Sequence, residues 1–215
     1  MGDSEPRSII LVGGGGHASV MAEAARRAGT SIVGFLDDQR TVLYDYHEWL
    51  GPIDQLGEAL AANPEAVWAL AIGDVSARRR ILDRMIHVAA QIRSVVDPGA
   101  VLSANVDLGS GCFVGTNAVL QPRVTIKKYA IINSGAIVEH DCLVGENTHI
   151  APGAVLGGNV KIGSDTLIGL GARVKPGVKI GSGVTVGVGA VVINDIDDGQ
   201  TVVGVPARAL GSAVQ

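Results

Sequence analysis

Aromatic side chains are scarce in this sequence. Phe, Trp and Tyr make up 3% of its 215 residues, whereas hydrophobic residues as a whole make up 47%. Any core must therefore be built mostly from small aliphatic side chains. Glycine is abundant, at 30 residues, but it does not recur at every third position, which excludes a collagen-like triple helix. This composition favours a repetitive all-β region with many tight turns.

Cysteine is scarce, and long charged blocks and long apolar runs are missing. Two cysteines are too few for the disulfide framework of a small secreted domain and fit a reducing cytosol. The net charge of −4, without a basic block, argues against nucleic-acid binding. The first residues lack a signal-peptide pattern, and charge or repeated glycine interrupts every apolar stretch of membrane-spanning length. We therefore expect a soluble cytoplasmic protein.

A six-residue repeat occupies the second half of the sequence. From Val96 to Val192, every sixth residue is Val, Ile or Leu, at seventeen consecutive positions. Four residues after each of them, from Ala100 to Ala190, only Ala, Val, Cys and Thr occur. Such a period is typical of a parallel β-helix, in which short strands alternate with turns and aliphatic side chains stack inward in columns.

Cysteine and glycine occupy specific positions within the six-residue repeat. Cys112 and Cys142 both fall in the small-residue phase, so we expect them to pack inside rather than to react. Glycine often follows the aliphatic position, and we interpret it as a residue that gives the turn its backbone freedom. These glycines are Gly109, Gly115, Gly145, Gly163, Gly181 and Gly187.

The first 93 residues show a different pattern, which predicts a separate α/β domain at 1–93 before the β-helix domain at 94–215. In order, we expect a strand at 8–12, a glycine run at 13–16, a helix at 18–28, a strand at 31–36, an acidic pair at 37–38, a strand at 67–72 and a helix at 75–85. Strand, glycine loop, helix, strand and acidic pair form a Rossmann-like βαβ unit.

The glycine loop is the first candidate site. It follows a strand and opens a helix, so its backbone N–H groups and the helix N-terminus suit a phosphate or pyrophosphate. We assign Gly13, Gly14, Gly15 and His17 to substrate binding on this basis. The alternative is a glycine-rich turn that binds no ligand.

Acidic residues at the end of the second strand support a nucleotide ligand. Asp37 and Asp38 lie where such folds hydrogen-bond a ribose or a base. NAD is the usual ligand of this arrangement, but this half of the chain is too short for a full dinucleotide-binding fold. A nucleotide-activated sugar also carries a pyrophosphate and fits better.

A histidine flanked by carboxylates interrupts the aliphatic repeat. His140, in Glu139-His-Asp141, falls in the turn of its hexad and should point outward. Imidazole accepts a proton near neutral pH, and an adjacent carboxylate fixes its tautomer. A second histidine, His149, follows half a coil later. The alternatives are a solvated turn residue and a zinc site, but two histidines in the repeat are fewer than the three that a zinc site of this fold uses, so we expect no metal.

Five motifs together resemble those of one enzyme family. They are Ile9-Ile-Leu-Val-Gly-Gly-Gly-Gly-His17, Gly34-Phe-Leu-Asp-Asp38, Ala71-Ile-Gly-Asp74, Asn133-Ser-Gly-Ala-Ile-Val-Glu-His140 and Gly204-Val-Pro-Ala-Arg208. The sequence is similar, over nearly all of its length, to the hexapeptide-repeat sugar-nucleotide acetyltransferases of bacterial glycan pathways. These include bacillosamine-pathway and perosamine N-acetyltransferases and sialic-acid O-acetyltransferases. Some relatives have Glu after the histidine, whereas this chain has the shorter Asp141.

The resemblance implies the architecture and the ligands. It implies a left-handed β-helix with three hexads in each coil, hence between five and six coils, and a homotrimer with active sites between subunits. The nucleotide-linked sugar would bind the first domain, and its sugar would reach His140. Acetyl-CoA would lie in the groove between two β-helices, with no metal.

The resemblance also assigns roles to individual residues. His140 and Asp141 would be catalytic, and Gly73 and Asn117 would join the substrate site. The remaining assignments are for acetyl-CoA: His149, Gly169, Lys175 and Arg208. For Lys175 and Arg208 the alternative is a solvated surface charge.

These inferences predict an N-acetyltransferase that acts on the 4-amino group of a nucleotide-linked sugar, such as GDP-perosamine, in surface-glycan or O-antigen biosynthesis. One alternative is O-acetylation of a sugar or sialic acid. An alternative of another class is a non-catalytic protein that binds nucleotide sugars. The sequence leaves the base open among guanine, uracil and thymine.

Overall fold

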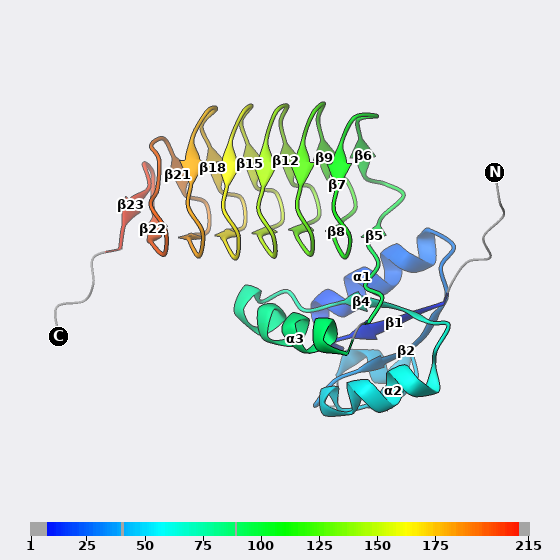
Figure 1. Ribbon diagram of the computed structural model, residues 1–215. Helices are drawn as coiled ribbons and strands as arrows, with labels where there is room; N and C mark the ends of the chain where they lie inside the picture. Colours follow the sequence, from blue (N-terminus) through cyan, green and yellow to red (C-terminus); the bar gives the residue numbers. More distant parts are fainter. Residues whose placement is uncertain (1–7, 40, 89, 211–215) are drawn as a thin grey trace, which may run out of the picture. The chain divides into compact units, whose positions relative to one another are not determined.

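A computed structural model describes residues 8–39, 41–88 and 90–210 (Figure 1). The chain divides into two compact units, Met1–Pro98 and Gly99–Gln215. The division falls a few residues after the boundary expected at 93. No helix of the described part is long and apolar enough to cross a membrane.

Unit 1 is a small α/β domain around a four-stranded parallel sheet with the order β3-β2-β1-β4. Its elements are β1 (Ile9–Val12), α1 (Gly16–Arg27), β2 (Ile32–Leu36), η1 (Val42–Asp45), β3 (Trp49–Gly51), η2 (Ile53–Gln55), α2 (Leu56–Ala62), β4 (Val67–Leu70), α3 (Val75–His87) and β5 (Val95–Val96). Strands β1 and β4 are buried along their whole length, because both consist of apolar residues. The expected βαβ unit is confirmed, whereas β3 and α2 were not predicted.

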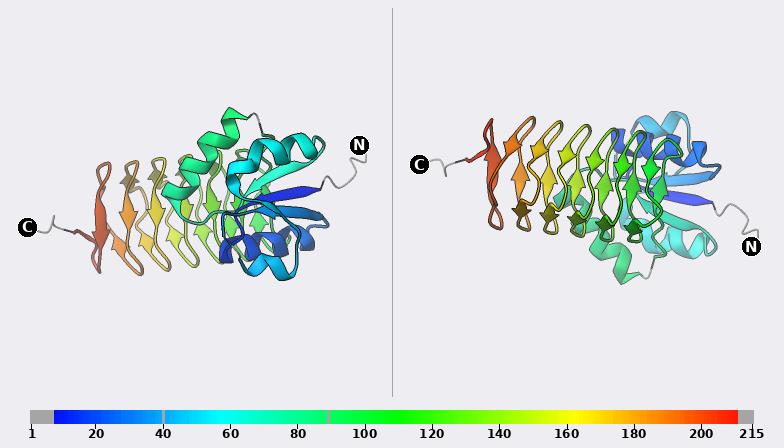
Figure 2. Two further views of the ribbon diagram at one scale, coloured as in Figure 1. Left: turned by 90° about the horizontal axis from the view of Figure 1, so that it is seen from below. Right: turned by 90° about the horizontal axis from the view of Figure 1, so that it is seen from above.

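Unit 2 is a parallel β-helix, shown from two further directions in Figure 2. Its strands are β6 (Val101–Leu102), β7 (Asp107–Leu108), β8 (Phe113–Val114), β9 (Val119–Leu120), β10 (Thr125–Ile126), β11 (Ile131–Ile132), β12 (Ile137–Val138), β13 (Leu143–Val144), β14 (His149–Ile150), β15 (Val155–Leu156), β16 (Lys161–Ile162), β17 (Leu167–Ile168), β18 (Arg173–Val174), β19 (Lys179–Ile180), β20 (Thr185–Val186), β21 (Val191–Val192), β22 (Thr201–Val203) and β23 (Arg208–Ala209). Each aliphatic residue of the repeat is the second residue of a two-residue strand, and from Val114 to Val192 each is buried. The predicted hexad phase is therefore confirmed.

Successive strands belong in turn to three sheets, so the coil has three sides. Sheet 1 has the order β21-β18-β15-β12-β9-β6, and sheet 2 has the order β19-β16-β13-β10-β7. Sheet 3 contains β8, β11, β14, β17, β20, β22 and β23. Turns therefore form three edges, of which two matter below: the sheet 1–2 edge and the sheet 3–1 edge.

The glycines that follow the aliphatic positions have a different role from the one expected. None of them has a positive φ. Within the repeat, positive φ angles occur instead at every sixth residue from Gly111 to Gly189, a set that includes Asp141. A Cβ at Gly145 would instead lie 2.5 Å from the amide nitrogen of Ser164, in the next coil. The expectation of backbone freedom was wrong there, because these positions need glycine for the close approach of neighbouring coils.

The two kinds of glycine predict different effects of substitution. We expect Gly145→Ala to lower the free energy of unfolding by about 2–4 kcal/mol, because the new methyl group meets backbone atoms that cannot move alone. Gly153→Asn should cost less than about 1 kcal/mol, since Gly153 has a φ of 67° and no atom near its Cβ position, and Asn tolerates this conformation. Urea unfolding of both variants tests this, and equal losses would contradict it.

Candidate functional site

The glycine loop of unit 1 uses its first two amides internally. The N–H of Gly13 donates to the carbonyl of Leu36 at 2.8 Å, and the N–H of Gly14 donates to Oδ2 of Asp37 at 2.7 Å. Both glycines are buried, whereas Gly15 and Gly16 are exposed at the start of α1, which has no side-chain cap. The part of the loop that can meet a phosphate is therefore Gly15–Gly16 and the α1 N-terminus.

The acidic pair holds neighbouring loops in place. Asp37 also accepts from the N–H of Gln39 at 2.9 Å, and Asp38 accepts from the N–H of Ile53 at 2.8 Å. Trp49 donates its Nε1–H to the carbonyl of Asp37 at 3.0 Å and stacks on Tyr44, with ring centroids 5.7 Å apart. The expected nucleotide contacts of Asp37 and Asp38 remain predictions, and the structure adds a structural role for each.

Gly73 lies three residues after the end of β4, close to the glycine loop. A Cβ at Gly73 would lie 3.6 Å from Cβ of His17, so the two assigned residues are neighbours. Arg78 is buried and donates Nη1–H to the carbonyls of Ile72 and Gly73 at 3.0 Å each. Arg78 therefore shapes this loop, a role that was not predicted from the sequence.

His140 lies in the turn between β12 and β13, on the sheet 1–2 edge. Its side chain is 56% exposed, as expected for a turn position. Nδ1 of His140 lies 2.7 Å from Oδ2 of Asp141, within hydrogen-bonding distance. The shorter Asp141 thus reaches the imidazole, and the ionised carboxylate accepts a hydrogen from Nδ1, which leaves Nε2 of a neutral imidazole as the basic nitrogen.

Arg123, one coil earlier on the same edge, binds the same carboxylate. Its Nε lies 2.6 Å from Oδ1 of Asp141 and its Nη2 lies 2.8 Å from Oδ2. These hydrogen bonds, and then the one from His140, hold the pKa of Asp141 well below its usual range. The carboxylate is therefore ionised at any pH at which the histidine can act as a base.

Gly158, in the next coil, lies against the imidazole ring of His140. A Cβ at Gly158 would lie 2.6 Å from both Nε2 and Cε1 of His140. The ring therefore rests against backbone that has no side chain, and glycine at this position leaves room for the basic nitrogen.

His149 lies on β14 and is paired with Asn133. The side-chain oxygen of Asn133 accepts a hydrogen bond from the N–H of Ser134 at 2.8 Å, which fixes the orientation of the Asn133 amide. In this orientation Nδ2 of Asn133 donates to Nε2 of His149 at 3.1 Å. An Nε2 that accepts a hydrogen bond carries no proton, so neutral His149 is protonated on Nδ1. Asn133 was quoted in a motif but was not predicted to contact this histidine.

The predicted residues of unit 2 fall on two sides of the coil. His140, Asp141 and Lys175 follow strands of sheet 1 and lie on the sheet 1–2 edge. Asn117 and Gly169 follow strands of sheet 3, the sheet that carries His149, and lie on the sheet 3–1 edge. Sheet 3 does not form the sheet 1–2 edge, so His140 and His149 lie on opposite sides of one coil.

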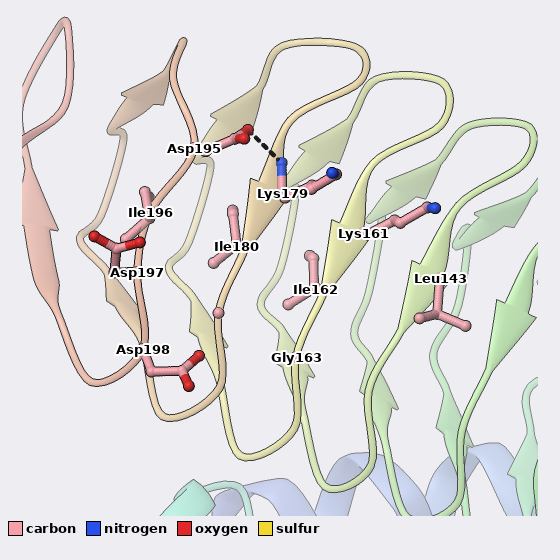
Figure 3. Close-up of a pocket in the computed structure, with 11 residues that line it drawn as sticks. Leu143, Lys161, Ile162, Gly163, Lys179, Ile180, Asp195, Ile196, Asp197 and Asp198 are labelled. Carbon is pink, nitrogen blue, oxygen red and sulfur yellow. Dashed lines mark hydrogen bonds between the residues drawn. The ribbon is translucent and has the colours of Figure 1, made fainter.

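An open groove of about 670 Å³ lies over sheet 2, next to the edge that carries His140 (Figure 3). The side chains of Lys161 and Lys179 project from neighbouring strands in register, and Asp195 accepts the backbone N–H of Lys179 at 2.8 Å. Lys175 is exposed close to this sheet, whereas Arg208 lines a separate cavity of about 210 Å³.

The cysteines are internal, as expected. Cys142 is buried, and its Sγ lies 3.2 Å from the carbonyl oxygen of Gly157. Burial raises the pKa of the Cys142 thiol to about 11, so the thiol is not a nucleophile at neutral pH. Within residues 8–39, 41–88 and 90–210, no group of three or more His, Cys, Asp or Glu side chains is arranged to hold a metal ion.

Known protein families match consecutive parts of the chain. The PglD N-terminal domain matches residues 8–85, the GMPPB C-terminal domain matches 81–169, and the hexapeptide repeat of succinyl-transferase matches 159–193. The acetyltransferase domain of PglB from Neisseria gonorrhoeae FA1090 is 36% identical, with a TM-score of 0.89, over 95% of this chain and 100% of that one. The chain belongs to the hexapeptide-repeat sugar N-acetyltransferases.

Other members of this family are also similar. PerB from Caulobacter crescentus, solved with CoA and GDP-perosamine, is 34% identical with a TM-score of 0.89, over 95% of this chain and 97% of that one. The UDP-N-acetylbacillosamine N-acetyltransferase of Bacillus subtilis is 31% identical over 110 residues, which span about half of that protein (51%) and 50% of this chain. The resemblance inferred from the motifs and the predicted fold class are confirmed.

The contact between Gly158 and His140 gives a direct test of the site. We expect Gly158→Ala to rotate the imidazole out of place and to lower kcat at least ten-fold, with little loss of stability because only a mobile side chain must move. Acetyl transfer and thermal unfolding should be measured together. In a His140→Ala background the same change should cost no further activity, and an additional loss there would show that Gly158 acts elsewhere.

Proposed function

We propose that the protein transfers an acetyl group from acetyl-CoA to the 4-amino group of a nucleotide-linked deoxy sugar. The observation that carries this proposal is the His140–Asp141 pair on an exposed edge of a sugar N-acetyltransferase fold. The pair supplies a base with a fixed tautomer, and the described chain offers no accessible thiol nucleophile.

The chemistry needs one proton acceptor. Acetyl-CoA supplies the acetyl group as a thioester. The amine nitrogen adds to the thioester carbonyl to form the C–N bond and a tetrahedral intermediate, and the C–S bond breaks when this intermediate collapses. Nε2 of His140 takes the proton that the sugar amine loses, while Asp141 stabilises the imidazolium that results. Backbone N–H groups of the coil would stabilise the oxyanion of the tetrahedral intermediate. The proton then passes from His140 to the departing thiolate, which restores the neutral imidazole.

Unit 1 offers the nucleotide site. The exposed amides of Gly15 and Gly16 at the start of α1 suit the pyrophosphate, and Asp37 and Asp38 would contact the ribose or base. The 34% identity to PerB, which was solved with GDP-perosamine, favours a GDP-linked 4-amino sugar as the substrate.

Acetyl-CoA would bind between two subunits of a homotrimer. His140 and His149 lie on opposite sides of one coil, so a site that uses both must take them from different chains. Asn133 holds His149 beside the thioester, and Gly169 lies along the same side. Lys175 is exposed in the turn between β18 and β19 and is the candidate for the CoA phosphates.

An apolar face next to His140 supports this assembly. The outward residues of sheet 1 form an in-register row of aliphatic side chains that a single arginine interrupts, and Val101 in that row is 59% exposed. The other four aliphatic side chains of the row are half-buried, and a contiguous apolar row that stays partly accessible is typical of an interface. The members are Val101, Val119, Ile137, Val155, Arg173 and Val191.

The biological setting follows from the substrate. An N-acetylated nucleotide sugar would be used in surface-glycan or O-antigen biosynthesis. Two buried free cysteines fit a reducing compartment, so we place the enzyme in the cytoplasm.

An acetyl-CoA consumption assay with GDP-, UDP- and dTDP-linked 4-amino sugars tests the proposal. We expect turnover with one amino sugar, and a loss of at least about 10²-fold in kcat with His140→Ala if the histidine acts as the base. A loss of only a few-fold would reduce His140 to a positioning residue.

The same assay with the corresponding 4-hydroxy sugars is the control. Transfer to hydroxyl sugars in place of amino sugars would establish O-acetylation instead. No transfer to either class, together with no binding of acetyl-CoA, would leave a non-catalytic protein that binds nucleotide sugars.

A further inference from the structure

Arg123 is joined to His140 through a single carboxylate. The guanidinium contacts both oxygens of Asp141, at 2.6 and 2.8 Å, in a fork-to-fork arrangement. The Oδ2 atom of this carboxylate is also the atom that lies 2.7 Å from Nδ1 of His140. Such a bidentate pair fixes the plane of the carboxylate, which one hydrogen bond from an imidazole cannot do.

The β-helix itself brings the two residues together. Arg123 and Asp141 are eighteen residues apart and occupy the same turn position in successive coils, with φ angles of 61° and 62°. The backbone N–H of Arg123 also donates to the side-chain oxygen of Asn105, at 3.3 Å, one coil earlier. The guanidinium is therefore presented by a turn that is itself held in place.

We propose that Arg123 is a positioning residue for the acetyl transfer, which holds the Asp141 carboxylate against Nδ1 of His140 and limits how strongly that carboxylate favours the imidazolium. This inference rests on the proposed function of His140. It gives Arg123 two separable effects, one from its fork geometry and one from its positive charge.

Few other charges compete with Arg123 near the imidazole. In its own turn, His140 is flanked by Glu139 and Asp141. The following coil contributes Gly158 and Asn159, which carry no charge, and the preceding coil contributes Arg123. Lys175 lies on the same edge but two coils further along the β-helix. Removal of Arg123 therefore leaves His140 between two carboxylates, which favour the protonated ring.

Two substitutions separate the effects. Arg123→Lys keeps the charge but loses the fork, so we expect kcat to fall about ten-fold while the acid limb of the kcat/KM profile against pH stays in place. Arg123→Ala loses both, so the acid limb should also move to higher pH, by about half a pH unit, the effect of one charge at a few ångströms in a water-like medium.

Lys127→Ala is the matched control. It removes one exposed positive charge from the same coil, beyond β10, and should leave both kcat and the acid limb unchanged. An acid limb that stays in place in Arg123→Ala, or that moves as far in Lys127→Ala, would overturn the proposal.

Nuclear magnetic resonance of the full chain gives a readout that does not need turnover. The ring signals of His140 can be assigned by their loss in His140→Ala, among five histidines in the chain. The pH at which the ring gains its proton should rise in Arg123→Ala and stay unchanged in Arg123→Lys. If the pH rises in Arg123→Ala while no sugar is acetylated, Arg123 controls His140 through Asp141 but the proposed reaction fails. If the pH does not rise, the proposed effect of Arg123 on His140 fails whatever the reaction.

Discussion

The close approach of successive coils is the constraint on which the rest of the β-helix depends. Neighbouring strands must lie about 4.8 Å apart for their backbone hydrogen bonds to form. At this spacing the backbone of the next coil leaves no room for a side chain at positions such as Gly145. This spacing brings turn residues eighteen positions apart into contact. It places Arg123 on Asp141, Gly158 under His140, and Asn133 beside His149. The site is therefore a direct product of coil stacking.

The same geometry separates the candidate catalytic residues within one chain. His140 with its carboxylate lies on the sheet 1–2 edge, whereas His149 and Asn133 belong to sheet 3 and its edge with sheet 1. An apolar row on sheet 1 lies next to His140 and is the proposed interface with another copy of the chain. Assembly would then bring a base from one subunit to an acetyl donor held by its neighbour, which accounts for the separation of the two histidines within one chain.

Much of this could be predicted from the sequence, and the exceptions have physical causes. The hexad phase located each two-residue strand, because a buried aliphatic column leaves a strict period. β3 and α2 were missed because their segment has no clear period. The role of the glycines was misread because coil spacing cannot be seen in a single hexad. Arg123 and Asn133 were overlooked as partners, although a comparison of residues eighteen apart would have paired Arg123 with Asp141.

Subunit complementation tests the central claim most directly, namely that one site takes His140 and His149 from different chains. His140→Ala and His149→Ala should each be inactive alone. When the two are unfolded together and reassembled at equal amounts, random mixing gives about a quarter of the sites both native histidines, so activity should return to about a quarter of that of the parent protein. No recovery in mixed trimers of proven composition would show that the site lies within one chain and would contradict the proposed assembly.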